Sequence, residues 1–495
     1  MKMKISNERM IMMRKLCLVV LWYAFFFFMI MIARDHYQTF RDFHYHIAMI
    51  ALVAIAMLTR KNFKLKLLSF IPAGIIVLSG LNYIYDERAE FGWEYRFVLL
   101  SRYCLIAGLV IFFLSIVLSK EDLCFGWRRS LGGILLILFV TTASVIKYTG
   151  AYSLYFPVIL ILLVGKLDKD AIREQMDLIA ISMYINFLIS MTVSVIKEPT
   201  LGAGGRYGGI FLFPVVVALL SVMALFSILH FLKKSIDNWQ NTLPNIRCRN
   251  LIILALLSIF PAVMLFLSGN RAVMLGVLII IAAFAVHFIR GRKLKTQIIS
   301  FSLVGVLLIV GAVGIIWMSQ NFNSHDFAEK LNIDSESAGY YFIDHLPSKR
   351  ESSPTGVFKP GSVWASLDAT SSDRLGIWVT GLKKVTWFGK NDTTIILPTG
   401  ENSGHVHSTY IYWLLLWGIL GGGLSIIWVL YLFFDEIIYL FHKKGEIIPG
   451  LFIMLAFGVL FVEKQLVQEL LPTMMIVFSY RFFYEIEDSK PIEEA

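Results

Sequence analysis

Apolar residues along this chain come in long runs that are separated by short polar and basic connections, a pattern typical of membrane-spanning helices. A bilayer hydrocarbon core of roughly 30 Å requires about 20 consecutive apolar residues in a helix. By this rule we predict about fourteen spans, of which 153–166, 447–462 and 470–484 are the weakest, so that twelve or thirteen also fit. The predicted spans are 16–34, 44–59, 67–85, 97–118, 130–147, 153–166, 177–196, 209–232, 250–268, 272–289, 297–318, 409–434, 447–462 and 470–484.

Composition excludes a soluble globular protein. Hydrophobic residues make up 57% of the chain and charged residues only 16%, whereas soluble domains are less apolar and carry more charge. We therefore predict an all-α, polytopic membrane protein with about 12–14 transmembrane helices.

Basic residues predict the orientation, because Lys and Arg are retained on the cytoplasmic side during insertion. The N-terminus and alternate short connections carry this excess, so the net charge of +10 is read as a topological signal, and nucleic-acid binding is not expected. The first apolar run resembles a signal peptide but lacks a small-residue cleavage site, which predicts an uncleaved span. The basic residues are Lys2, Lys4, Arg9, Arg14, Lys15, Arg60, Lys61, Lys64, Lys66, Lys120, Arg128, Arg129, Lys233, Lys234, Arg247, Arg249, Arg290, Arg292, Lys293, Lys295, Lys443 and Lys444.

One connection is long, and it divides the chain into four regions. These are N-terminal spans (1–200), spans with arginine motifs (201–318), an extracytoplasmic loop or cap (319–407), and C-terminal spans with a short cytoplasmic tail (408–495). The loop is rich in Trp, Tyr and Phe, which favours a folded cap over a tether. Within it, residues 372–385 offer Ser and Asp as N-caps, and Leu375, Trp378 and Leu382 share one helical face.

Three arginines are predicted on the extracytoplasmic side. Arg206 lies in a glycine-rich segment, where a backbone can approach a ligand closely. Arg271 lies at a tight reversal between two spans, and Arg374 begins the predicted loop helix. A guanidinium binds phosphate through paired hydrogen bonds, although a single arginine at a span end is more often an interfacial anchor, and Arg374 could instead pair with Asp373 or Glu401.

His405 and His407 lie where the long loop meets the next span. An imidazole in a water-filled cavity at this boundary can act as a base near neutral pH. Zinc would need further ligands, and the sequence places no third histidine or carboxylate beside this pair, so we expect no metal. The aromatic run that follows, Tyr410 to Trp417, fits an interfacial belt.

These separated pieces together resemble the O-antigen ligase and polymerase superfamily of bacterial envelope glycosyltransferases. At the end of the large loop that family has a His, an Asn, and then an apolar helix with two glycines three apart. The upstream arginine motifs also occur in the family's order, over roughly residues 200–425. The matching residues here are His405, His407, Ser408, Tyr410, Ile411, Gly418 and Gly421, with Arg206, Gly208, Arg271, Arg374 and Trp378 upstream.

The resemblance implies a metal-independent, inverting glycosyltransferase without a cofactor, in the bacterial inner membrane, with its active site facing the periplasm. Its donor would be a glycan on undecaprenyl diphosphate, and its acceptor lipid A-core or a lipid-linked glycan. His407 would be the general base, and Arg271 and Arg374 would hold the diphosphate. Arg206, Tyr207, His405 and Trp378 would contact substrate.

Two departures from the family pattern concern the site. Ser408 stands in place of the usual Asn, which bears on how the catalytic histidine is oriented, and Pro214 lacks the Asn residues that commonly flank it. Which of His405 and His407 is the base rests on the spacing alone, and this favours His407.

Three alternatives to an O-antigen ligase remain open from the sequence. A repeat-unit polymerase would use the same chemistry on a lipid-linked acceptor, and a ligase that transfers glycan to a protein would share the motifs. A transporter of lipid-linked glycans would also need many spans, although transporters usually show internal repeats and polar residues inside spans.

Overall fold

The computed structural model describes an all-helical protein, as the sequence predicts. It describes residues 2–34, 38–59, 169–197, 207–211, 214–238, 241–289, 355–370, 374–390, 393–400, 408–442 and 448–462, with Asn402, Val406 and scattered helical positions between 131 and 142. Within these residues the only β pairing is one isolated bridge between Ile396 and Asn402. The predicted spans 67–85, 97–118, 153–166, 297–318 and 470–484 lie outside the described residues.

The long apolar runs form long helices. Five helices of the described part are long and apolar enough to cross a membrane, and three shorter apolar helices accompany them. The elements are α1 (Lys2–Arg34), α2 (Gln38–Thr59), α7 (Lys169–Lys197), the 3₁₀ turn η4 (Gly209–Phe211), α8 (Pro214–Asp237), α9 (Pro244–Leu267), α10 (Arg271–Ile289), α14 (Val363–Thr370), α15 (Arg374–Lys383), α16 (Thr409–His442) and α17 (Ile448–Val462). The protein is therefore a multi-pass membrane protein.

Proline positions help to fix where two of these helices begin. Pro214 is the first residue of α8, and Pro244 opens α9 after an extended Leu243. Proline suits the first turn of a helix because it has no N–H to lose there and its φ is already helical. The structure thus gives Pro214 a local role as a helix start.

Helix α8 is central and α9 is peripheral. In the most apolar stretch of α8, 78% of positions are buried, against 17% in α9. Helix α8 packs against α7, α9, α10 and α17, whereas large apolar side chains of α9 such as Ile252, Leu256 and Ile259 are exposed. An exposed apolar face of this length is what a bilayer covers.

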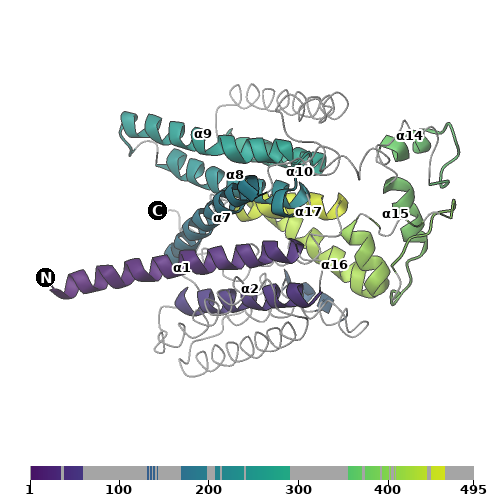
Figure 1. The fold of residues 1–495 in the computed structure, drawn as a ribbon, viewed down its shortest axis with the longest axis horizontal. Helices are drawn as coiled ribbons and strands as arrows, with labels where there is room; N and C mark the ends of the chain where they lie inside the picture. Colours follow the sequence, from purple (N-terminus) through teal and green to yellow (C-terminus); the bar gives the residue numbers. More distant parts are fainter. Residues whose placement is uncertain are drawn as a thin grey trace, which may run out of the picture.

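The two ends of the bundle differ. The N-terminus of α1 lies at one end, and α14 and α15 lie at the other, beside α16 (Figure 1). Arg14 of α1 and Glu174 near the start of α7 form an ion pair of 2.8 Å, so the basic N-terminal residues and the start of α7 share an end. The residues that the sequence assigns to the cytoplasmic side and to the cap are therefore separated by the length of the bundle.

Candidate active site

The glycine-rich segment that carries Arg206 lies against the turn that carries Arg271. The backbone N–H of Tyr207, the residue after Arg206, donates a 2.8 Å hydrogen bond to the carbonyl of Leu267. Leu267 ends α9, and Arg271 begins α10 only four residues later. Arg206 itself and the side chain of Arg271 lie outside the described residues, so the structure brings together their neighbouring backbone.

The turn between α9 and α10 is the tight reversal that the sequence predicts. Gly269 has φ of +59°, a left-handed conformation that favours glycine. The Oδ1 atom of Asn270 accepts the N–H of Val273 at 3.1 Å, which makes Asn270 the N-cap of α10. Arg271 is consequently held in the first helical turn, where backbone N–H groups and the helix dipole favour an anion.

Ser194 of α7 fixes the glycine-rich segment from the other side. Its Oγ lies 2.9 Å from the hydroxyl of Tyr207 and accepts the N–H of Ile210 at 3.1 Å. Gly209 has φ of +52°, and a Cβ there would fall 1.7 Å from the Ser194 Oγ. No other residue fits at this position without moving Ser194. This contact explains why position 209 of the glycine-rich segment is a glycine.

Arg374 is the first residue of α15, the helix predicted at 372–385. The predicted N-caps, Ser372 and Asp373, lie outside the described residues. An unpredicted residue instead bonds to the first turn: Asp368 of α14 is fully buried and accepts the N–H of Gly376 at 2.7 Å. Its second oxygen accepts the hydroxyl of Thr355 at 2.6 Å.

The buried face of α15 differs from the predicted one. Ile377, Gly376 and Gly381 are buried, whereas Leu382 is 50% exposed. Of the apolar face predicted from Leu375, Trp378 and Leu382, Trp378 packs against a buried apolar cluster of the cap and Leu382 does not. The glycines let the neighbouring chain approach closely, since a Cβ on Gly381 would lie 3.2 Å from a methyl of Val406. A prediction based on apolar residues does not detect such glycine positions.

A small apolar cluster links α15 to the chain on either side of His407. Val406 is fully buried in it, Ser408 is 1% exposed, and the Ser408 carbonyl accepts the N–H of Tyr412 to open α16. His405 and His407 lie outside the described residues, but the positions flanking His407 are both buried. The cluster consists of Ile377, Ile395, Leu397, Val406, Ile411 and Leu415, with Trp378, Val385 and Tyr412 packed against it.

Helix α16 is broken where the sequence predicts one continuous span over 409–434. Gly418 has φ of +68° and ψ of −172°, which interrupts the helical hydrogen bonds. Residues 386–390 of the cap supply the missing partners: Lys390 N–H donates to the Leu415 carbonyl at 2.8 Å, and the N–H groups of Ile419 and Leu420 donate to the Thr386 and Trp387 carbonyls.

The first part of α16 folds back onto the second part across this break. A Cβ on Gly422 would lie 2.6 Å from the carbonyl oxygen of Trp413, although the two residues are nine apart in sequence. A straight helix would separate them by roughly 13 Å. Residues 409–417 therefore form a short helix of their own that is too short to cross a bilayer.

Helix α17 contacts both motif-bearing helices at nearly the same position. The hydroxyl of Tyr410 donates to the carbonyl of Phe457 at 3.0 Å. On α10, a Cβ on Gly276 would lie 2.6 Å from a methyl of Leu455. Leu455 and Phe457 are two residues apart, so α17 holds the beginning of α16, directly after His407, close to the first part of α10, which starts at Arg271.

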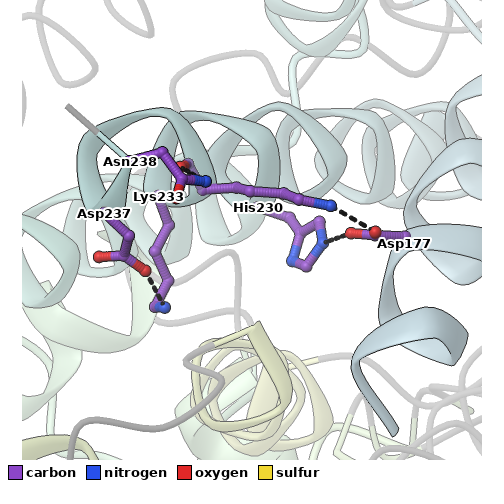
Figure 2. A network of polar contacts seen from close by, with 6 residues as sticks. Asp177, His230, Lys233, Asp237 and Asn238 are labelled. Atoms are coloured by element: carbon purple, nitrogen blue, oxygen red, sulfur yellow. Dashed lines mark hydrogen bonds and ion pairs between the residues drawn. The ribbon is translucent and has the colours of Figure 1, made fainter. Parts of the chain in front are cut away.

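A second polar cluster, which the sequence analysis overlooked, lies between α7 and α8 (Figure 2). Asp177 accepts from Lys234 through one carboxylate oxygen, and its other oxygen lies 2.8 Å from Nε2 of His230. His230 is 5% exposed. Asp177 is near Glu174, which pairs with Arg14, so this cluster lies at the end of the bundle away from the cap. The sequence does contain a signal for this cluster, because a histidine and a carboxylate inside predicted spans are rare and usually paired.

Comparison with known families agrees with the resemblance seen in the sequence. Residues 254–426 match the family model described as O-Antigen ligase. The matched region starts within α9 and ends in α16, so that it contains Arg271, Arg374, His405 and His407 and leaves out Arg206. The predicted resemblance to the O-antigen ligase superfamily is thus confirmed over about a third of the chain, and it supports a membrane enzyme of the glycan ligase and polymerase type. Searches of curated proteins and of solved structures gave no match.

Proposed function

We propose, starting from the O-antigen ligase match over residues 254–426, that this chain transfers a completed O-polysaccharide from undecaprenyl diphosphate to a sugar hydroxyl of lipid A-core. The reaction would take place at the periplasmic face of the bacterial inner membrane. The observation that supports the proposal is that α17 packs against both α10 and α16, while α15 packs against α16, so the elements that carry or adjoin the separated motifs lie next to one another.

The first step of the mechanism is binding of the donor diphosphate. Arg271 is held in the first turn of α10 by the Asn270 cap, where helix N–H groups also favour an anion. The Tyr207 hydrogen bond keeps the backbone next to Arg206 against the same turn. Two guanidinium groups from these neighbouring segments, with Arg374 from α15, would neutralise the charge that develops on the leaving diphosphate.

The second step is activation of the acceptor. His407 would accept the proton of a sugar hydroxyl while the oxygen attacks the anomeric carbon, and the bond to the diphosphate would break on the opposite side, which inverts the configuration. The burial of Val406 and Ser408 supports this role, because a base whose flanking residues are fixed loses little freedom when substrate binds. His405 and Trp378 would contact the glycan, and no metal or cofactor takes part.

The test is an assay of the purified full-length protein with a glycan on undecaprenyl diphosphate as donor, lipid A-core as acceptor, and EDTA present. Removing a general base typically lowers the rate by about 10² to 10⁴, so His407→Ala should nearly abolish transfer. His345→Ala, a loop histidine outside the matched motifs, is the matched control and should transfer at the rate of the unchanged protein. Transfer by His407→Ala at that rate would contradict the mechanism.

The same assay separates the neighbouring activities by its product. Elongation of the donor with the core acceptor untouched would identify a repeat-unit polymerase. Donor that is consumed only when a protein acceptor is supplied would indicate glycan transfer to protein. Donor that moves between leaflets of vesicles without being consumed would favour a transporter.

A further inference from the structure

Five large apolar side chains are exposed together at the break in α16. We name this the outer patch and define it as Leu382, Trp387, Phe388, Ile419 and Leu420. Trp387 is 63% exposed and Phe388 is 65% exposed, and the other three are between 42% and 50% exposed. Exposed apolar residues that lie together mark a surface for a partner or a membrane, so the outer patch points to an occupant.

Backbone hydrogen bonds fix the outer patch at one end of a membrane span. The N–H groups of Ile419 and Leu420 donate to Thr386 and Trp387, and these are the first residues of α16 after the break. From there α16 continues as 16 residues without a charge to Phe434, before Asp435 and Glu436, and this stretch is roughly 24 Å long, most of a hydrocarbon core of about 30 Å. The patch therefore lies where this span leaves the bilayer on the side of the cap.

The close fit at the break prevents the patch from moving away from this level. A Cβ on Gly389 would lie 2.2 Å from the Leu416 carbonyl oxygen, and one on Gly418 would lie 2.2 Å from the Trp387 carbonyl oxygen. Both glycines have positive φ. The cap segment is thus seated in the helix break by backbone packing, and Trp387 and Phe388 project from it.

The described cap segment that carries Leu382, Trp387 and Phe388 is basic. Residues 374–390 contain one arginine and three lysines and no Asp or Glu. Lys383 and Lys390 are exposed, whereas Lys384 is directed to the Thr394 carbonyl. Aromatic residues with flanking lysines are the composition that binds the boundary between lipid headgroups and acyl chains, and the lysines are attracted to an anionic lipid surface.

We propose that the outer patch inserts into the lipid surface and anchors the cap to it, with Trp387 and Phe388 at the level of the headgroups and Lys383 and Lys390 on anionic lipid phosphates. A second protein would be a different occupant, but the basic charge and the position at the end of a span favour lipid. This anchoring does not depend on the proposed reaction. Its consequence is that the helix carrying Arg374 is held at a fixed height above the bilayer.

The test uses the full-length protein reconstituted into vesicles of phosphatidylcholine and phosphatidylglycerol. A solvatochromic fluorescent amino acid is incorporated in place of Phe388, and in a second protein in place of Trp364. Trp364 is the matched control, since it is an exposed aromatic residue of α14 in the same cap and is not part of the patch. Brominated phosphatidylcholine and aqueous iodide serve as quenchers of the lipid and water phases.

At position 388 we expect blue-shifted emission that brominated lipid quenches strongly and iodide quenches little. At position 364 we expect iodide to quench strongly and brominated lipid to quench little. Strong iodide quenching at position 388 would overturn the proposal, because the patch would face water. Protection from both quenchers would overturn it as well, because another protein surface would cover the patch. Both proteins are first shown to be monodisperse by gel filtration, so that misfolding is recognised.

The role of the lysines is tested in the same system. Raising the phosphatidylglycerol content should increase the brominated-lipid quenching at position 388, and the double substitution Lys383→Gln with Lys390→Gln should abolish this increase. Both side chains are exposed, so the folded structure should tolerate the change. An increase that persists in the double variant would remove these lysines from the anchor.

Discussion

The backbone N–H of Tyr207 donates a 2.8 Å hydrogen bond to the carbonyl of Leu267, and this bond joins the two segments in which Arg206 and Arg271 lie. The bond is placed by Ser194, which contacts both the Tyr207 hydroxyl and the N–H of Ile210. Two neighbouring arginine motifs therefore depend on one small hydroxyl in α7, and this dependence can be measured.

Ser194→Ala should destabilise the protein more than Tyr207→Phe. The alanine removes the contact with the Tyr207 hydroxyl and also leaves the Ile210 N–H without its Ser194 acceptor, whereas the phenylalanine removes one contact and keeps the bond from Ile210 to Ser194. A lost hydrogen bond costs about 0.5–1.5 kcal/mol, and a buried group left unpaired costs about 1–3 kcal/mol. The melting temperatures of both variants in the same detergent give the order, and equal or reversed values would show that Ser194 does not hold this segment.

Gly418→Ala should be strongly destabilising. Its φ of +68° and ψ of −172° belong to a region that essentially only glycine adopts, at a cost of about 1–3 kcal/mol for another residue, and the new Cβ would lie 2.2 Å from the Trp387 carbonyl oxygen. Gly423→Ala is the matched control in the same helix, because a Cβ there meets nothing within 4 Å. It should be neutral or stabilising by up to about 1 kcal/mol. Thermal unfolding of the two purified variants tests this, and similar melting temperatures would contradict the break.

Asp368→Ala should loosen the cap around Arg374. The carboxylate accepts the Gly376 N–H and the Thr355 hydroxyl inside the cap, and hydrogen bonds to charged groups contribute about 1.5–3 kcal/mol each. Hydrogen exchange at α15, Gly376 included, should become faster in the alanine variant. Asp368→Asn keeps an acceptor of the same shape and should change exchange less. Unchanged protection of α15 in the alanine variant would show that the helix does not need this cap.

Asp177→Ala should destabilise the bundle and Asp237→Ala should not. Asp177 joins α7 to His230 and Lys234 of α8, and His230 is buried. Among the described residues Asp237 pairs along its own helix with Lys233 and is 52% exposed, and such a pair contributes about 0.2–0.5 kcal/mol. A dye-based melting experiment on both variants should give a clear fall for Asp177→Ala alone. Equal melting temperatures would mean that the α7 to α8 contact is held by apolar packing.

Hydropathy predicted the long apolar helices of the described part, because bilayer thickness imposes a length that the sequence must meet, but it did not predict the short cap helix α14. The reversal at Gly269 and the helix that begins at Arg374 were also predicted, since their signals are local residues in the correct order. The positions of His405, His407 and Arg206, and of the Arg271 side chain, remain predictions, because these lie outside the described residues.

Features that depend on two distant segments could not be predicted in this way. The break at Gly418 is stable only because residues 386–390 supply hydrogen-bond partners, and three consecutive glycines at 421–423 gave no reason to place a break before them. The Asp368 cap reaches α15 from another helix, while the sequence rule looks for a cap directly before the first turn. The buried positions of α15 include Gly376 and Gly381, which a search for periodic apolar residues does not detect.

The attachment of the cap to α16 is made by main-chain atoms: three N–H groups and three carbonyls at 386–390, 415 and 419–420. Main-chain bonds are insensitive to side-chain identity, except that proline removes a donor. Residues 386–390 can therefore diverge widely between relatives without releasing the cap, provided that the glycines remain. An alanine scan of this stretch would report little effect on the attachment except at Gly389, where a Cβ would lie 2.2 Å from the Leu416 carbonyl oxygen, whereas a proline at position 390, 419 or 420 would detach the cap.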